Sequence, residues 1–320
     1  MSQNNWYDTF MDILSKKYPK QKQLISALMD LLALEREAVY RRLRKEVVFS
    51  IHEIVAIASA WNISLDEITG INSGNISFQM KAMNYLEPSE EEANFLRYII
   101  QSISFLKNFP ETEFMDICNK IPRQLLAGYP YLNRFYLFKW MHQYNNESDT
   151  VTFSKITVSK EKKKIDEEYY HAIKQVPNSN FIFDRNIFEY LVQDIQYFCS
   201  IYLITDQEKE FIKKDLLALL NYLLEVANKG CYPESQNKVN LYISQLKIDT
   251  SYSYTYTPEV NICYIHVFEK FEIYSYNSEM VSNFMTWMQL KKRSAIQISE
   301  VDEKHRIDFF TKQQKIIENL

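Results

Sequence analysis

The fold of the N-terminal part of this chain is decided by residues 35–70, which read EREAVYRRLRKEVVFSIHEIVAIASAWNISLDEITG. This stretch predicts two consecutive amphipathic helices, the first rich in arginine and the second largely apolar. Within the first helix, Val39 and Leu43 stand one helical turn apart, so both side chains can share one buried face. The arginines then project from the other sides of this helix.

The second helix has a clear start signal. Ser50 is followed three residues later by Glu53, the spacing of a capping box that fixes where a helix begins. An apolar stripe follows it, made of Ile51, Ile54, Val55, Ile57, Ala58 and Trp61. Ser64 and Glu67 repeat the capping spacing and predict a single closing turn after Asn62.

The preceding residues predict two more helices and a local excess of positive charge. Residues 6–18 carry spaced apolar side chains and end before Pro19, which disfavours a helical residue in front of it. Residues 20–32 show the broad apolar stripe of a helix packed on its neighbours. Residues 16–45 hold nine lysines and arginines against three acidic residues. Over residues 1–74 the two signs balance at nine each, so we expect a neutral domain with one basic side.

Residues 39–70 resemble, without a gap, the second half of the Cro/CI (XRE-type) helix-turn-helix domain. In that family a recognition helix is followed by a loop, a serine-capped helix and an ending close to the N-I-S-L-D-E-I that begins here at Asn62. The chain departs from the family pattern at Ala33 and Lys45, where the family usually has glycine, and at Ile25, where it has glutamine. The resemblance covers less than a quarter of the chain.

This resemblance implies a DNA-binding transcriptional regulator whose arginine-rich helix lies in the major groove. The candidate base-edge contacts are Arg36, Glu37, Tyr40, Arg41 and Arg44. The candidate phosphate contacts are Lys16, Lys20, Lys22, Lys45 and His52. We expect the partner to be a double-stranded DNA operator that is bound by a homodimer.

Composition argues against several other classes of protein. Only four glycines occur in 320 residues, whereas the phosphate loops of nucleotide-dependent enzymes need several at close spacing. The four cysteines and five histidines are scattered, which predicts reduced thiols and no metal or catalytic residues. We therefore expect a protein that is not an enzyme and needs no cofactor. No stretch suits a membrane span or a secretory signal, which predicts a cytoplasmic protein without membrane contact.

The fold class expected for the whole chain is mainly α, in three domains. Residues 1–72 would form the helix-turn-helix bundle and residues 73–84 a linker. Residues 85–232 would form a central helical region for dimerisation or sensing. Residues 233–320 would form an α+β part with a small antiparallel sheet.

Helix signals are strong in the central region. Ser89 and Thr205 are each followed three residues later by glutamate, and Gly230 marks the end of the helix that begins after Thr205. The spacing of apolar residues also favours a helix over residues 111–126. Four later stretches alternate as strands do and are rich in Tyr, Ile, Val and Phe: 239–248, 252–256, 262–268 and 271–276.

Aromatic residues, 15% of the chain, leave two interpretations open. They can line a pocket for a small-molecule or peptide effector, or they can fill an ordinary core or a dimer interface. The balanced charge of residues 1–74 also leaves open a second function, a protein- or peptide-binding interaction module built on the same helical fold. DNA binding should weaken steeply as salt rises, which separates the two functions.

Overall fold

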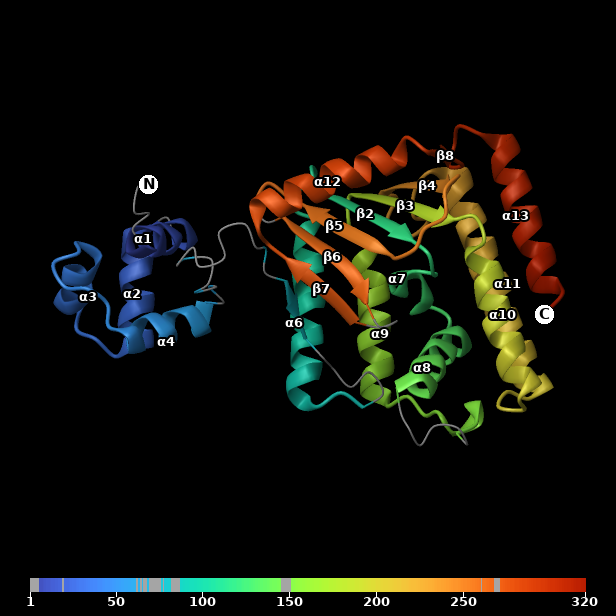
Figure 1. Cartoon of the computed structure of the whole chain (residues 1–320), viewed down its shortest axis with the longest axis horizontal. Helices are drawn as coiled ribbons and strands as arrows, with labels where there is room; N and C mark the ends of the chain where they lie inside the picture. The colour runs from blue at the N-terminus through green and yellow to red at the C-terminus, as the bar shows by residue number, and fades with distance from the viewer. Residues whose placement is uncertain are drawn as a thin grey trace. The chain divides into compact units, whose positions relative to one another are not determined.

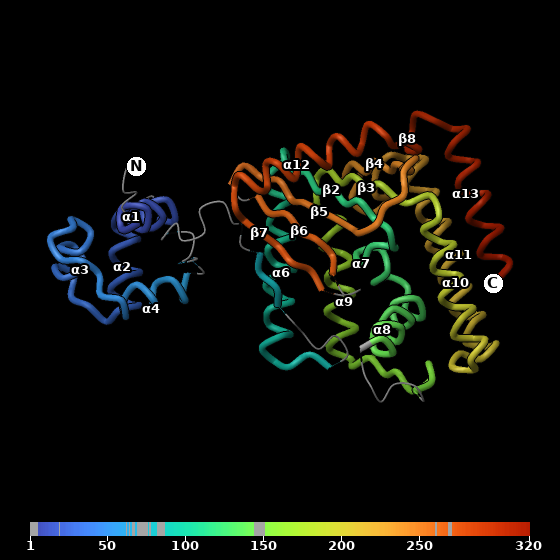
Figure 2. The backbone as a smooth tube through the Cα atoms, in the orientation of Figure 1, coloured from blue at the N-terminus to red at the C-terminus, as the bar shows by residue number. Residues whose placement is uncertain are grey.

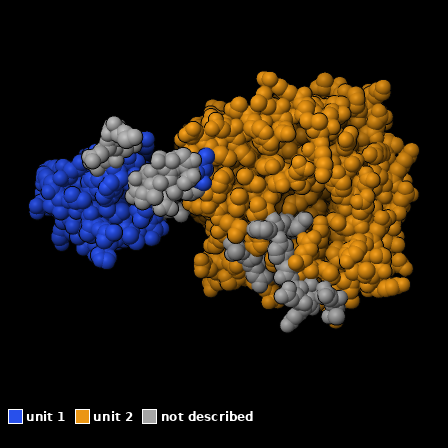
Figure 3. Space-filling model, in the orientation of Figure 1, with its two compact units in different colours: residues 1–76 blue, residues 77–320 orange. Residues whose placement is uncertain are grey.

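The computed structural model describes residues 6–18, 20–61, 63, 65, 68, 76, 78–81, 87–144, 151–259, 261–267 and 271–320. The chain forms two compact units, residues 1–76 (unit 1) and residues 77–320 (unit 2) (Figure 3). The expected linker over residues 73–84 falls largely outside the described residues. The expected cap formed by Ser64 and Glu67 lies outside them as well.

Unit 1 is built from helices around one apolar core. The helices are α1 (Trp6–Lys17), α2 (Gln21–Leu32), α3 (Arg36–Leu43) and α4 (Ile51–Trp61). Each contributes to the core, where Phe10, Leu28, Val39 and Ile57 are completely buried. All four helices begin and end close to the residues where the apolar spacing predicts them.

The start of α4 confirms the expected capping box. The Glu53 amide donates to the Ser50 hydroxyl oxygen at 3.3 Å, and the Ser50 amide donates to the Glu53 carboxylate at 2.8 Å. The apolar stripe expected for this helix is only partly buried. Ile51 and Val55 remain exposed, at 73% and 46% of their surface, whereas Ile54 and Ile57 face the core.

The fold class predicted for the whole chain is wrong, because unit 2 is built on a large mixed sheet. Its eight strands run in the order β1-β7-β6-β5-β2-β3-β4-β8 (Figure 1). They are β1 (Gln79–Met80), β2 (Glu113–Cys118), β3 (Asn178–Asp184), β4 (Lys238–Ser244), β5 (Tyr252–Tyr256), β6 (Ile262–Val267), β7 (Phe271–Ser275) and β8 (Ala295–Gln297). Strands β2, β3 and β4 pair in parallel, and the other pairs are antiparallel. The region expected to be helical therefore supplies two central strands.

Burial on both faces explains why β2 and β3 escape detection in the sequence. After its first residue every side chain of β2 is buried, and the same holds for β3. A strand that is covered on both sides has no polar alternation, so its apolar residues fit a helical spacing equally well. The helix expected over residues 111–126 is in fact β2 followed by the short helix α7 (Arg123–Leu126).

Helices cover the two faces of the sheet unequally (Figures 1 and 2). On one face α12 (Ser278–Lys292) packs Val281, Phe284 and Met288 against strand residues such as Met115 and Tyr254. The opposite face carries the largest apolar core. The helices that contribute to it are α6 (Glu90–Leu106), α7, α8 (Pro130–Tyr144), α9 (Lys160–Ile173), α10 (Ile187–Ser200), α11 (Asp206–Lys229) and α13 (Glu303–Glu318).

Several helix ends in unit 2 follow the sequence signals. Ser89 and Thr205 form complete capping boxes at the starts of α6 and α11. Gly230 ends α11 with a φ of 65°, the left-handed conformation expected of a glycine cap. A Cβ atom at this position would lie 2.4 Å from the Glu300 side chain, so a larger residue would require that side chain to move as well as a strained left-handed backbone.

The parallel strands bring their carboxyl ends to one edge of the sheet. The chain passes from β2 to β3 through α7, α8 and α9, and from β3 to β4 through α10 and α11. In open α/β sheets the space beyond these strand ends is the usual place for a ligand. None of the described helices is long and apolar enough to span a lipid bilayer.

Candidate nucleic-acid interface

The side chains expected to contact bases lie together on the outer surface of α3. Arg36, Glu37, Arg41 and Arg44 are exposed, and Tyr40 is half-buried. The guanidinium carbons of Arg36 and Arg44 lie 5.9 and 5.6 Å from the centre of the Tyr40 ring. Contacts of this kind hold the cations near the ring while leaving their hydrogen-bond donors in solvent.

The opposite side of α3 is fixed to the rest of unit 1. Val39 is completely buried, and Leu43 packs against the same core, as their spacing predicts. Arg42 adds a polar anchor, since its Nε and Nη2 donate to the two carboxylate oxygens of Glu53 at 3.1 and 2.8 Å. Its Nη1 also donates to the Ala38 carbonyl oxygen at 3.1 Å. This bidentate pair joins α3 to α4 and sets the position of the exposed arginines.

Arg42 has a role that sequence reasoning missed. In the sequence Arg42 is only one of several basic charges, whereas the structure places it in an ion pair whose two side chains are each 16% exposed. Burial opposes ionisation of Glu53, but the hydrogen bonds from Arg42 and Ser50 lower its pKa below the ordinary 4.5. Glu53 is the residue whose sequence position could have indicated this pair, because a capping carboxylate at the start of α4 can also accept hydrogen bonds from the preceding helix.

The Arg42–Glu53 pair makes the stability of unit 1 depend on pH. Because the folded-state pKa of Glu53 is lowered, its contribution is fully present above pH 4.5 and is lost as the pH falls through the folded value. Glu53→Gln is expected to cost about 1.5–3 kcal/mol at pH 7 and to flatten this acid dependence. Hydrogen exchange of unit 1 amides in the full chain, at pH 7 and pH 4, measures both the loss of stability and its dependence on pH. Equal acid sensitivity in the variant would contradict the assignment, and Glu37→Gln on the exposed side of α3 is the matched control.

The two positions where the helix-turn-helix family has glycine both adopt the left-handed conformation here. Ala33, at the end of α2, has a φ of 50°, and Lys45, after α3, has a φ of 63°. A side chain in this conformation costs roughly 1–2 kcal/mol relative to the right-handed region. Ala33 and Lys45 therefore add backbone strain to the two turns of unit 1.

Ala33→Gly is expected to stabilise unit 1 by about 0.5–1 kcal/mol, because glycine adopts the left-handed conformation without strain. The gain is smaller than the full strain, since glycine also loses more backbone freedom on folding. Ala27→Gly, within the same helix, is the matched control and should destabilise it by about 1 kcal/mol. Thermal unfolding of the full chain, together with hydrogen exchange of the unit 1 amides, distinguishes the stabilisation expected for Ala33→Gly from the destabilisation expected for Ala27→Gly. Destabilisation by both changes would exclude strain at Ala33.

The expected phosphate contacts lie on α1, at the start of α2, directly after α3 and near the start of α4. All five are exposed: Lys16, Lys20, Lys22, Lys45 and His52. Lys20 is the N-cap residue of α2 and makes no side-chain cap hydrogen bond, which leaves the positive end of that helix open to an anion. Lys45 instead forms an ion pair with Asp8, and this hydrogen bond raises its pKa. A phosphate at Lys45 would therefore share this ammonium group with Asp8.

The arginines of α3 carry weak ion pairs that DNA can replace. Glu46 lies 3.8 Å from both Arg41 Nε and Arg44 Nη1, and all three side chains are at least 49% exposed. Exposed pairs at this distance contribute little to stability. A guanidinium group can therefore leave Glu46 and donate two hydrogen bonds to the edge of a guanine.

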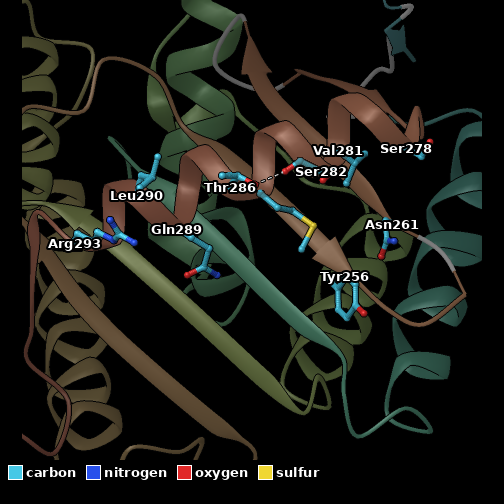
Figure 4. Close-up of a pocket in the computed structure, with 10 residues that line it drawn as sticks. Tyr256, Asn261, Ser278, Val281, Ser282, Thr286, Gln289, Leu290 and Arg293 are labelled. Atoms are coloured by element: carbon cyan, nitrogen blue, oxygen red, sulfur yellow. Dashed lines mark hydrogen bonds between the residues drawn. The ribbon is translucent and has the colours of Figure 1, made fainter.

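Unit 2 has an open groove of about 480 Å³ beside α12 (Figure 4). Helix residues such as Val281, Met285 and Leu290 form one wall, and Tyr256 and Asn261 from the sheet form the other. Among the described residues that line it, Arg293 is the only charged one. This lining offers surface for contact but no group for chemistry.

Comparison with known proteins adds nothing to this geometry. No family model matches the chain, and neither a curated protein nor a solved structure proved similar to it.

Proposed function

We propose that this protein is a cytoplasmic, non-enzymatic DNA-binding transcriptional regulator. The observation that carries this proposal is the arrangement of α3, which holds Val39 in the core and presents Arg36 and Arg41 to solvent. The Arg42–Glu53 pair keeps that face in a fixed orientation. A short, rigid helix with exposed guanidinium groups suits the width and hydrogen-bonding pattern of the DNA major groove.

The contacts divide into two groups with different effects. Arg36, Arg41 and Arg44 would contact base edges, which determines sequence preference. Lys20 and Lys22, beside the open end of α2, would contact phosphates, which gives affinity and salt dependence. Because one eight-residue helix reaches few base pairs, we propose that a homodimer binds two half-sites about 34 Å apart.

Selection of bound sequences from a random pool of double-stranded DNA tests this function. The full chain should enrich a two-fold symmetric site, and its affinity for that site should fall steeply between 50 and 200 mM salt, by orders of magnitude for about six or more phosphate contacts. Light scattering on the free protein and on the complex gives the number of chains bound. Failure to enrich any sequence, together with salt-independent binding, would reject the proposal.

A protein-interaction module is the second candidate, and one observation favours it. Val48, Ile51 and Val55 expose 60%, 73% and 46% of their surface near the start of α4. Apolar side chains gathered in this way often mark a surface for another protein. A partner bound there should be released by Ile51→Asp but not by Arg41→Ala, whereas DNA binding should show the opposite response.

A further inference from the structure

A second site lies in unit 2, at the carboxyl end of β2 on the face of the sheet that carries most of the helices. Two adjoining hollows share the lining residues Lys120, Tyr136, Ser251 and His266. The inner hollow is narrow, about 40 Å³, and reaches Asp116. The outer hollow is larger, about 380 Å³, and opens beside α8 and α10. Together they have the size of a pocket for a small molecule.

The register of the sheet brings the polar groups of the inner hollow to the same face. Asp116 pairs with Ser253, which pairs in turn with Tyr264, so these three side chains point the same way. Two residues after Tyr264, His266 shares that face and pairs with Glu272 across β6 and β7. The Nδ1 atom of His266 lies 3.5 Å from a carboxylate oxygen of Glu272.

Two buried polar atoms in this inner hollow have no hydrogen-bond partner among the described residues. One is Oδ1 of Asp116, a residue only 2% exposed, and the other is Nε2 of His266. The second carboxylate oxygen of Asp116 is occupied, because Gln124 donates to it at 2.8 Å. Burial raises the pKa of Asp116, and burial together with the Asp116 carboxylate raises that of the neighbouring Cys118 thiol well above its ordinary value. This thiol is only a weak donor toward Asp116, so Oδ1 can still accept a stronger hydrogen bond. An unpaired buried polar group costs about 1–3 kcal/mol, so two in one hollow indicate a missing polar group.

Among the described residues that line the outer hollow, basic side chains outnumber acidic ones. Lys120 and Lys139 line it together with one carboxylate, that of Asp194, which accepts from Lys139 at 2.8 Å. The first residue of α10, Ile187, also lines it, and the N-cap residue of that helix makes no side-chain cap hydrogen bond. The positive end of the helix and the ammonium groups of the two lysines favour a ligand group with negative charge.

We propose that this pocket binds a small carboxylic acid that also carries a hydroxyl or ammonium donor. The donor would enter the inner hollow and bond to Asp116 Oδ1 and His266 Nε2. The carboxylate would remain in the outer hollow, near Lys120 and the start of α10. An α-amino acid and a 2-hydroxy acid share this arrangement of donor and carboxylate. The proposal does not depend on DNA binding.

Thermal unfolding and calorimetric titration of the full chain, without DNA, test the site with three sets of probes. These are the twenty standard L-amino acids, a series of 2-hydroxy acids that includes lactate and malate, and acids without a donor such as acetate and propionate. At least one probe of the first two sets should bind one to one. The corresponding acid without a donor should bind at least ten times more weakly. The set that binds decides between an ammonium and a hydroxyl donor.

Three variants show whether the binding uses this pocket. Asp116→Asn and Lys120→Gln should each lower the affinity for the titrated probe at least tenfold. Lys164→Gln, an exposed lysine on α9, should leave its affinity unchanged. Lys120 lies at the half-exposed rim, so Lys120→Gln remains informative even if Asp116→Asn does not fold. Absence of binding by all probes, or parental affinity in both pocket variants, would overturn the proposal without affecting the DNA-binding one.

Discussion

The Arg36→Ala/Arg41→Ala double variant is expected to lose about 2–6 kcal/mol of binding free energy at its own operator. Each arginine that contacts a guanine edge contributes about 1–3 kcal/mol, and the two side chains lie on the same exposed face of α3. Because these contacts specify sequence, binding to unrelated DNA should weaken much less than binding to the operator. The ratio of the two affinities, measured by fluorescence anisotropy at one salt concentration, is therefore the decisive quantity.

A matched control and a stability check accompany this double variant. Arg185→Ala removes an exposed arginine from unit 2 and should leave operator affinity unchanged. Hydrogen exchange should show unit 1 of the double variant as stable as that of the parent, because neither arginine is buried. An unchanged ratio of operator to unrelated-DNA affinity would mean that another surface contacts the bases.

Asp166→Ala is expected to destabilise unit 2 by about 3–5 kcal/mol, since it leaves a buried cation without its partner. Asp166 accepts hydrogen bonds from Lys162, from Asn133 at 3.1 Å and from Arg123 at 3.4 Å. Lys162 is only 2% exposed, and burial lowers its pKa to about 8. Burial also opposes the charge on Asp166, but Arg123 and Lys162 lower its pKa. The two charges are thus stable inside the protein only as a pair.

Urea unfolding of the full chain, followed by a signal from unit 2, measures the effect of Asp166→Ala. The double variant Lys162→Met/Asp166→Leu is the control, because it removes both charges and should recover most of the lost stability. Because Asp166 raises the pKa of Lys162, its removal lowers that pKa below about 8, so the deficit of Asp166→Ala should shrink as the pH rises toward 8. If Asp166→Ala were as stable as the parent, the buried pair would have no part in the stability of unit 2.

Local signals in the sequence are sufficient to predict unit 1. The spacing of Val39 and Leu43 predicts the buried face of α3, and Ser50 with Glu53 predicts where α4 begins. These signals involve residues only a few positions apart, so their spacing is visible directly in the sequence. The link between Arg42 and Glu53 spans eleven positions and two helices, and no periodic pattern carries it.

In unit 2 such local signals predict only some of the strands. Strands β5, β6 and β7 alternate and were expected, but β2 and β3 are buried on both faces and have no alternation. The polar pocket near Asp116 cannot be predicted from the sequence, for a related reason. Asp116 and His266 become neighbours only because β5 lies between β2 and β6, and that pairing joins residues far apart in the chain.

The pairing of β1 with β7 has a mechanical consequence. Met80, four residues beyond the end of unit 1, is in register with Ile273, the residue directly after Glu272. Strand β7, which holds the partner of His266, is thus also the strand that pairs with edge strand β1, the first strand after the N-terminal unit. A displacement of Glu272 along its strand would therefore strain the two residues of β1 that pair with β7.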